Sequence, residues 1–186
     1  MISTADFRGG AKIELEGDPY IIVESQHVKP GKGGAFVRTK LKNLKTGNLL
    51  EKTFRSGERF NEPDLSEQEM QFLYMQDEAY HFMNTETYEQ LFLSADQVGS
   101  VKDFLKEDMI VKILFYQGSP LGIDLPLFVT LKIVETAPGV RGDTATGGTK
   151  SAKLETGGIV KVPLYIEEGT VIKIDTRTGS YIERVK

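Results

Sequence analysis

Residues 27–44 read HVKPGKGGAFVRTKLKNL. From Val37 to Lys42, every second side chain is aliphatic or a threonine, and the side chains between them are cations. A period of two is typical of a β-strand with one buried face. The residues before this strand include Pro30 and several glycines, which favour turns. The stretch therefore predicts a hairpin with a glycine-rich tip, in a protein built from strands.

Lys32 lies at the centre of this tip, where its ammonium group has no obvious partner. The residues around it are Lys29, Pro30, Gly31, Gly33 and Gly34. Four glycine or proline residues around one lysine are more than a hairpin requires, which indicates a functional loop. A phosphate-binding Walker loop is excluded because no serine or threonine follows Lys32. A Schiff-base enzyme would need a desolvated lysine, and an exposed tip is the wrong environment for one.

The strand after the loop predicts a basic face formed by Arg38, Lys40 and Lys42. Residues two apart on a strand lie about 6.6 Å apart, close to the spacing of successive phosphates in a nucleic acid. One interpretation is contact with RNA. The other is that these cations protect the outer face of an edge strand from aggregation. The sequence alone leaves both open.

Short strands separated by turn signals continue along the whole chain, which predicts an all-β fold of several small barrels in tandem. Abrupt changes in charge near Asp64 and Leu127, each beside a proline, predict three modules: residues 1–64, 65–127 and 128–186. One short helix is expected over residues 94–106, capped by Ser94 and weakened by Gly99. The expected strands are residues 12–16, 20–24, 36–44, 49–54, 70–75, 80–84, 88–93, 109–116, 128–135, 159–165, 170–175 and 180–185.

Charge is distributed unevenly along the 186 residues, whose formal net charge is −4. Residues 27–59 hold 9 Lys/Arg and 2 Asp/Glu, a local charge of +7, whereas residues 65–127 hold 3 and 11, a charge of −8. A polyanion would be attracted to the first module and repelled by the middle one. Aromatic residues crowd this acidic module, and at strand spacing most of the following are expected in the core: Phe72, Tyr74, Tyr80, Phe82, Tyr88 and Phe92.

Two further segments are informative. Residues 138–158 are rich in glycine and threonine and predict a long loop, either a flexible linker or a contact with RNA. Near the C-terminus, Tyr181 offers a stacking face, and Arg177 and Arg184 offer phosphate contacts. Strict alternation places Tyr181 and Arg184 on opposite faces, so a joint role would need an edge, a bulge or a large partner. The alternative is that they are ordinary surface residues.

Several classes of function find no support in the sequence. The two histidines, His27 and His81, are far apart and form no metal-binding or catalytic motif. Cysteine is absent, and no apolar stretch approaches the roughly 20 residues that span a bilayer. We therefore expect a cytoplasmic protein that does not bind membranes, has no catalytic residue and requires neither a metal nor a cofactor.

Several motifs, in order and at fitting spacing, resemble those of bacterial elongation factor P. They are VKPGKGGAFVR at 28–38, EKTF at 51–54, LGIDLP at 121–126, GDT at 142–144, LETG at 154–157, VPLYIEEG at 162–169 and DTRTGSYIERV at 175–185. One departure is Ser151, where the family commonly has proline, and we expect it to alter loop stiffness rather than function.

This resemblance implies an SH3-like (KOW-like) barrel followed by two OB-type barrels in an L-shaped arrangement. It also implies a monomer that binds the ribosome beside peptidyl-tRNA and relieves stalling at consecutive prolines. Lys32 matches a lysine that a modifying enzyme lengthens in many relatives, and that reaches toward the CCA end of the tRNA. Gly142, Asp143 and Thr144 match a loop near mRNA at the exit site, and Tyr181 and Arg184 match positions of ribosome and tRNA contact. The rival interpretation is a general single-strand RNA-binding protein of OB type.

Overall fold

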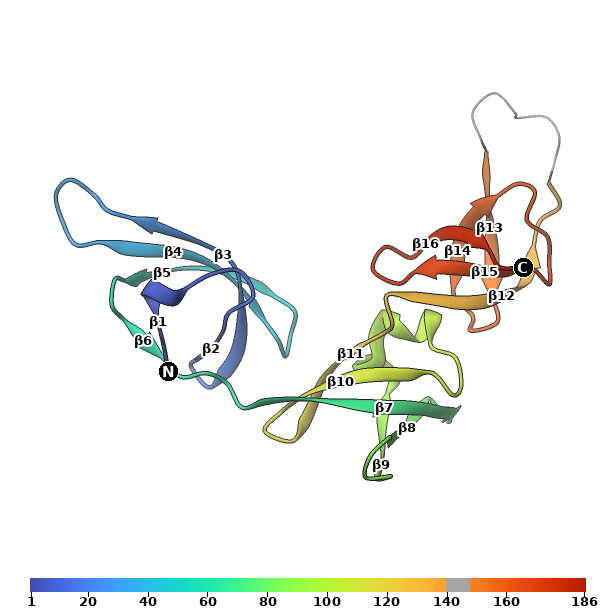
Figure 1. Cartoon of the computed structure of the whole chain (residues 1–186), viewed down its shortest axis with the longest axis horizontal. Coiled ribbons are helices and arrows are strands. Elements are labelled where there is room, and N and C mark those ends of the chain that lie inside the picture. The colour runs from blue at the N-terminus through green and yellow to red at the C-terminus, as the bar shows by residue number, and fades with distance from the viewer. Residues whose placement is uncertain (140–147) are drawn as a thin grey trace. The chain divides into compact units, whose positions relative to one another are not determined.

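The computed structural model describes residues 1–139 and 148–186, and strands dominate this part of the chain (Figure 1). The chain divides into two compact units, residues 1–67 with 114–122 and residues 68–113 with 123–186. Apart from a two-stranded pair, the described strands form three sheets of four or five strands each. The prediction of an all-β fold of several small barrels is confirmed.

The first unit contains a four-stranded antiparallel sheet with the order β2-β3-β4-β5. A three-residue 3₁₀ turn, η1 (Thr4–Asp6), follows the first strand. Aromatic rings close the core of the unit, where the Phe7 and Phe54 centroids lie 5.7 Å apart and the Phe54 and Phe60 centroids 4.8 Å apart. The sheet strands are β2 (Lys12–Leu15), β3 (Asp18–Val28), β4 (Phe36–Asn43) and β5 (Leu49–Arg55), and β1 (Ile2–Ser3) pairs with β6 (Arg59–Phe60).

Strand β4 has the alternation that its sequence predicts. Val37, Thr39 and Leu41 are buried, whereas Arg38 and Lys42 are exposed. The strand lies between β3 and β5 and is hydrogen-bonded on both sides. The edge-strand interpretation of its cations is therefore wrong, because an internal strand has no free edge to protect.

A five-stranded sheet follows, with the order β11-β10-β7-β8-β9. Met70, Phe72 and Phe82 are almost fully buried on its inner face. The boundary between the two units falls within three of these strands, because β7, β10 and β11 contribute residues to both units. The strands are β7 (Leu65–Gln76), β8 (Ala79–Asn84), β9 (Gln90–Ser94), β10 (Ile110–Tyr116) and β11 (Ser119–Asp124).

The last sheet has the order β14-β13-β12-β15-β16 and an aliphatic core that includes Leu131, Ile133, Val162 and Ile172. Strand β13 corrects the prediction of an uninterrupted loop over residues 138–158. Its buried side chains are Ala152 and Leu154. Because alanine is small and only weakly hydrophobic, the sequence shows no clear hydrophobic alternation here. The strands are β12 (Phe128–Thr136), β13 (Thr149–Leu154), β14 (Ile159–Pro163), β15 (Val171–Asp175) and β16 (Ser180–Arg184).

The expected helix is present but is only one turn long. Ser94 caps it, since its hydroxyl accepts a hydrogen bond from the Gln97 amide and the Gln97 side chain accepts one from the Ser94 amide. Helix α1 (Ala95–Val98) ends at Gly99, whose φ of +63° lies in the left-handed region. The chain then continues as the 3₁₀ helix η2 (Gly99–Phe104). Ser94 thus starts the helix and Gly99 ends it.

Within the second unit, the end of η2 and the segment after it are joined to the C-terminal sheet. Phe104 and Met109 pack against the core of that sheet. The Thr156 hydroxyl donates a hydrogen bond to the Asp103 carbonyl oxygen. The Glu155 carboxylate accepts from the Lys132 amide at 2.9 Å and from the Lys106 ammonium at 3.0 Å. Apolar packing and polar contacts therefore hold the two parts of this unit together.

Replacing Glu155 with glutamine is expected to lower the free energy of unfolding by about 1–2 kcal/mol at neutral pH. Burial alone would raise the pKa of Glu155, but the Lys132 amide and the Lys106 ammonium together hold it below the ordinary 4.5. The carboxylate therefore stabilises the fold above pH 4.5 and loses its effect as the pH falls through the lowered pKa. Urea unfolding at a series of pH values should show native and variant chains converging in acid. Glu167→Gln, an exposed position, is the control and should cost little at any pH.

Candidate functional site

The loop between β3 and β4 forms the outer end of a long hairpin (Figure 1). The last strand pair is Val28 opposite Phe36, so residues 29–35 connect the two strands. Lys29, Pro30 and Lys32 are all exposed. Lys32 makes no hydrogen bond, ion pair or ring contact within the described residues. The structure thus places the Lys32 ammonium in solvent at the tip, as the sequence predicts.

Only one glycine of this loop needs the conformational freedom that glycine provides. Gly33 has a φ of +111°, whereas Gly31 and Gly34 do not adopt left-handed angles. A side chain added at Gly31 or Gly34 would meet no atom within 4 Å. Of the two adjacent glycines, Gly33 uses the backbone freedom that glycine allows and Gly34 does not. Gly31 and Gly34 instead leave the surface around Lys32 bare.

The base of the loop is held more firmly than its tip. The Ser56 amide donates a hydrogen bond of 3.0 Å to the Ala35 carbonyl oxygen. The Arg38 guanidinium carbon lies 5.6 Å from the centroid of the half-buried Phe36 ring. These contacts anchor the point from which the loop projects, so the solvent-exposed Lys32 is attached to a defined support.

The basic strand face is less uniform than its sequence indicates. Lys40 lies directly opposite Glu24 on β3 and Glu51 on β5, so carboxylates flank it on both sides. Arg38, by contrast, faces the uncharged Gln26 and Thr53. These side chains line a pocket of about 510 Å³. Arg38 and Lys42 are therefore the cations of this face that remain available to an anionic partner.

The structure brings Tyr181 and Arg184 to the same face of β16, which corrects the expectation of opposite faces. Tyr181 pairs with Ile174, and Arg184 pairs with Ile172. The register shifts between these pairs, so that Ile182 has no partner and forms a bulge. Directly opposed residues share a face, and Ile172 and Ile174 share one. Since β16 is also an edge strand, two of the three alternatives for a joint role of Tyr181 and Arg184, an edge and a bulge, are present.

Tyr181 has a hydroxyl partner that the sequence analysis missed. Its hydroxyl oxygen lies 3.3 Å from that of Tyr165. Partial burial, together with this hydrogen bond, raises the pKa of Tyr181 to about 12. The Tyr181 hydroxyl is therefore protonated at physiological pH, and its ring offers a stacking surface without charge. No sequence signal connects the two tyrosines, because Tyr165 follows β14 whereas Tyr181 lies in β16.

Arg177 is less available for phosphate than its sequence indicates. Its Nη2 lies 2.7 Å from Oδ2 of the buried Asp175, and its Nε lies 3.1 Å from Oδ1 of the same carboxylate. This two-point pairing occupies one edge of the guanidinium. The hydrogen bond from Arg177 lowers the pKa of Asp175. Arg177 therefore supports the turn between β15 and β16.

Other predicted or excluded sites can be placed briefly. Gly142, Asp143 and Thr144 lie outside the described residues. The part of the chain that the structure describes contains no group of three or more His, Cys, Asp or Glu side chains that could hold a metal ion. Nor does that part contain a helix long and apolar enough to cross a membrane.

Three family models match successive parts of the chain. They are the elongation factor P (EF-P) KOW-like domain over residues 3–60, the elongation factor P (EF-P) OB domain over residues 65–123, and the C-terminal domain of elongation factor P over residues 129–184. Together they cover nearly the whole sequence.

Relatives match over the same length. Elongation factor P of Moorella thermoacetica is 57% identical over 184 residues, which is 99% of this chain and 100% of that protein. Elongation factor P of Natranaerobius thermophilus is 56% identical over 186 residues, 100% of this chain and 99% of that protein. Among solved structures, eukaryotic translation initiation factor 5A from Methanococcus jannaschii has a TM-score of 0.55 at 22% identity, over 64% of this chain and 88% of that one, a likeness of fold. The chain belongs to the elongation factor P family of translation elongation factors.

Proposed function

We propose that this elongation factor binds the ribosome beside peptidyl-tRNA and stimulates peptide-bond formation at consecutive prolines. Lys32, extended by a modifying enzyme, positions the CCA end of the tRNA. The factor acts as a cytoplasmic monomer with three modules at residues 1–64, 65–127 and 128–186, and needs no catalytic residue or cofactor. The extents of the three matching family models support this division.

One observation carries the proposal: within the described residues, the Lys32 side chain is exposed and has no polar or ring contact, at the tip of a hairpin that is anchored at its base. An ammonium in this position can approach phosphate oxygens and ribose hydroxyls without first breaking a contact within the protein. It is equally accessible to an enzyme that adds a group to its nitrogen. The local charge of +7 over residues 27–59 favours approach to RNA.

The physical mechanism is positioning. A prolyl peptide end is constrained and draws the reacting groups out of alignment, and ribosomal RNA performs the reaction itself. Holding a reactant close to its attack geometry can remove several kcal/mol of barrier without any protein acid or base. The Lys32 loop need supply only that geometry.

Other surfaces have supporting roles in the proposal. Arg38 and Lys42, with the flanked Lys40 between them, contact tRNA or rRNA phosphates. At the other end of the chain, the Tyr181 ring and the Arg184 guanidinium share one face and contact tRNA or rRNA together. The segment 142–144 approaches mRNA at the exit site.

The test is translation in an extract that lacks the native factor. Two reporters differ only in a run of three consecutive prolines or three alanines. Addition of this chain should restore full-length product from the proline reporter and leave the alanine reporter unchanged. Equal stimulation of both reporters, or of neither, would contradict the proposal. Equal affinity for free oligonucleotide and for ribosomes carrying peptidyl-tRNA would favour the general RNA-binding alternative.

A further inference from the structure

An exposed row of rings crosses the outer face of β7, β8 and β9. Tyr74 pairs with His81, and His81 pairs with Phe92, so the three side chains lie side by side on one face. The Tyr74 and His81 rings are stacked with centroids 4.6 Å apart, and the His81 and Phe92 centroids are 6.0 Å apart. Tyr74 is 42% exposed and Phe92 68% exposed. We call these three residues the aromatic row.

A β-bulge places Tyr74 in this row. The register between β7 and β8 shifts between Phe72 and Tyr74, and Leu73 has no partner. Without the shift, Tyr74 would point inward with the buried Phe72. The expectation that most aromatics of this module are core is correct for Phe72 and Phe82 but wrong for Tyr74, Tyr88 and Phe92, which are all exposed.

The side chains beside the row are uncharged. The cross-strand pairs on one side are formed by Gln71, Met83 and Gln90, and those on the other by Gln76, Ala79 and Ser94. A partner that covers the rings therefore need not desolvate a charge beneath it.

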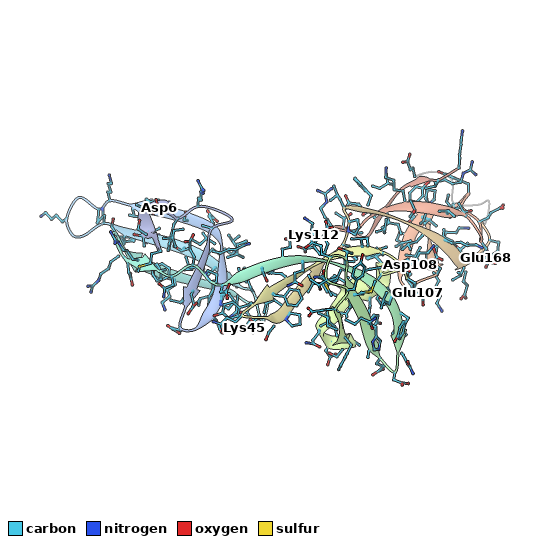
Figure 2. All side chains as sticks on the ribbon, turned by 60° about the horizontal axis from the view of Figure 1, so that its bottom comes forward. Asp6, Lys45, Glu107, Asp108, Lys112 and Glu168 are labelled. Atoms are coloured by element: carbon cyan, nitrogen blue, oxygen red, sulfur yellow. The ribbon has the colours of Figure 1, made fainter. Side chains whose placement is uncertain are left out.

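Carboxylates surround this uncharged strip. Asp77 and Glu78 form the tight turn next to Gln76 and Ala79, and both are exposed. At the other side, Asp108 accepts a hydrogen bond of 3.1 Å from the Gln71 side chain. Figure 2 marks Asp108 beside Glu107 on the segment that precedes β10.

The acidic character extends well beyond these neighbours. Residues 60–101 contain nine Asp and Glu and no Lys or Arg. Of the three cations that follow within the module, Lys102, Lys106 and Lys112, the second is already paired with Glu155. The phosphates of a nucleic acid would be repelled by these carboxylates. A second copy of the chain that docked through the same surface would be repelled as well, because its carboxylates would face the same groups. A cationic partner has the complementary charge.

We propose that the aromatic row is a docking site for an arginine-bearing segment of a partner protein. A guanidinium can stack on the exposed Tyr74 or Phe92 ring while its edge pairs with a carboxylate at the rim. Lysine lacks the planar group that stacks, so the site should prefer arginine. This surface is separate from the Lys32 loop and adds a protein contact to the RNA contacts of the proposed function.

The experiment uses the full chain and fluorescein-labelled probes at physiological salt. The probes are a peptide of alternating arginine and glycine, the same peptide with lysine in place of arginine, and oligouridine. The arginine peptide should bind most tightly. Phe92→Ser and Tyr74→Ser should each weaken its binding by roughly fivefold, the scale of one cation–ring contact. In amide NMR spectra of the native chain, the peptide should shift the signals of His81 and Phe92 most.

Two control variants separate stacking from general charge attraction. Tyr88→Asn removes a ring that is 70% exposed but lies before β9 and outside the row, and asparagine tolerates its φ of +61°. It should leave binding unchanged. Asp77→Asn keeps the left-handed turn, whose φ is +50°, but removes one rim charge. It should weaken binding and reduce the dependence on salt.

Each remaining outcome overturns the proposal. Equal binding of the arginine and lysine peptides would show attraction by charge alone. Tighter binding of oligouridine would identify a nucleic-acid surface. No binding of the arginine peptide to the native chain, or an equal loss in Tyr88→Asn and Phe92→Ser, would remove the aromatic row as the site. Thermal unfolding of each variant checks that the fold is retained.

Discussion

Lys32→Ala is expected to abolish the stimulation of the proline reporter while leaving the stability of the chain within about 0.5 kcal/mol of native. The stability should not change because Lys32 is exposed and makes no hydrogen bond, ion pair or ring contact within the described residues. The activity should change because the side chain supplies the positioning. A loss of about 3 kcal/mol of positioning free energy would slow the reaction by more than 100-fold.

Two matched variants make this prediction sharper. Lys29→Ala removes an exposed lysine from the same loop and should retain most of the activity. Lys32→Arg keeps the charge but not the primary amine that a modifying enzyme would extend. It should be as inactive as the alanine variant if the extension is required, and nearly native if charge alone suffices. An active Lys32→Ala chain would end the proposed role of this residue.

The intact mass of the natively expressed chain should be measured alongside this experiment. A mass excess confined to the peptide that contains Lys32 would identify the added group. Comparison of the chain made with and without its modifying enzyme, in the same reporter assay, then separates the effect of the lysine from that of its extension.

Gly158→Ala is expected to destabilise the second unit by about 2–3 kcal/mol. A Cβ atom at this position would lie 2.4 Å from the Asp103 carbonyl oxygen and 3.0 Å from the Asp103 Cβ. Neither is the free end of a flexible side chain, so η2 would have to move away from the turn between β13 and β14. That movement would also disturb the hydrogen bond between Thr156 and Asp103.

Gly122→Ala provides the matched control. Gly122 does not adopt a left-handed angle, and an added Cβ would meet nothing within 4 Å. It should change the unfolding free energy by no more than about 0.5 kcal/mol, because only the flexibility of the unfolded chain differs. Urea unfolding followed by circular dichroism measures both variants. Equal stability of the two would mean that the close approach at Gly158 does not constrain the fold.

The sequence predicted the features that depend on neighbouring residues. The alternation around Leu41, the Ser94 cap, the stop at Gly99 and the exposed Lys32 tip all follow from local patterns. What could not be predicted depends on a partner strand. For example, Lys40 can be placed between Glu24 and Glu51 only when the register of β3, β4 and β5 is known.

The predicted faces of some side chains were wrong for a related reason. A bulge shifts the phase of alternation without any sequence mark, so Tyr74 and Arg184 were each assigned to the wrong face. Strand β13 was not predicted because Ala152 is too small to stand out among polar neighbours in the sequence. In the structure, β13 lies between β12 and β14, and Ala152 is buried. In each case tertiary pairing decided what local composition left open.

The bulges at Val23, Leu73, Val134 and Ile182 also bear on how relatives are aligned. Each is a single aliphatic residue without a partner, and Val23, Val134 and Ile182 are 45–48% exposed although they are apolar. A one-residue gap at such a position is not a harmless change of loop length. It reverses the orientation of every side chain between the gap and the strand end, exchanging interior for surface. An insertion or deletion at one of these four positions in a relative therefore changes which side chains are exposed. A comparison of residue types alone would miss that change.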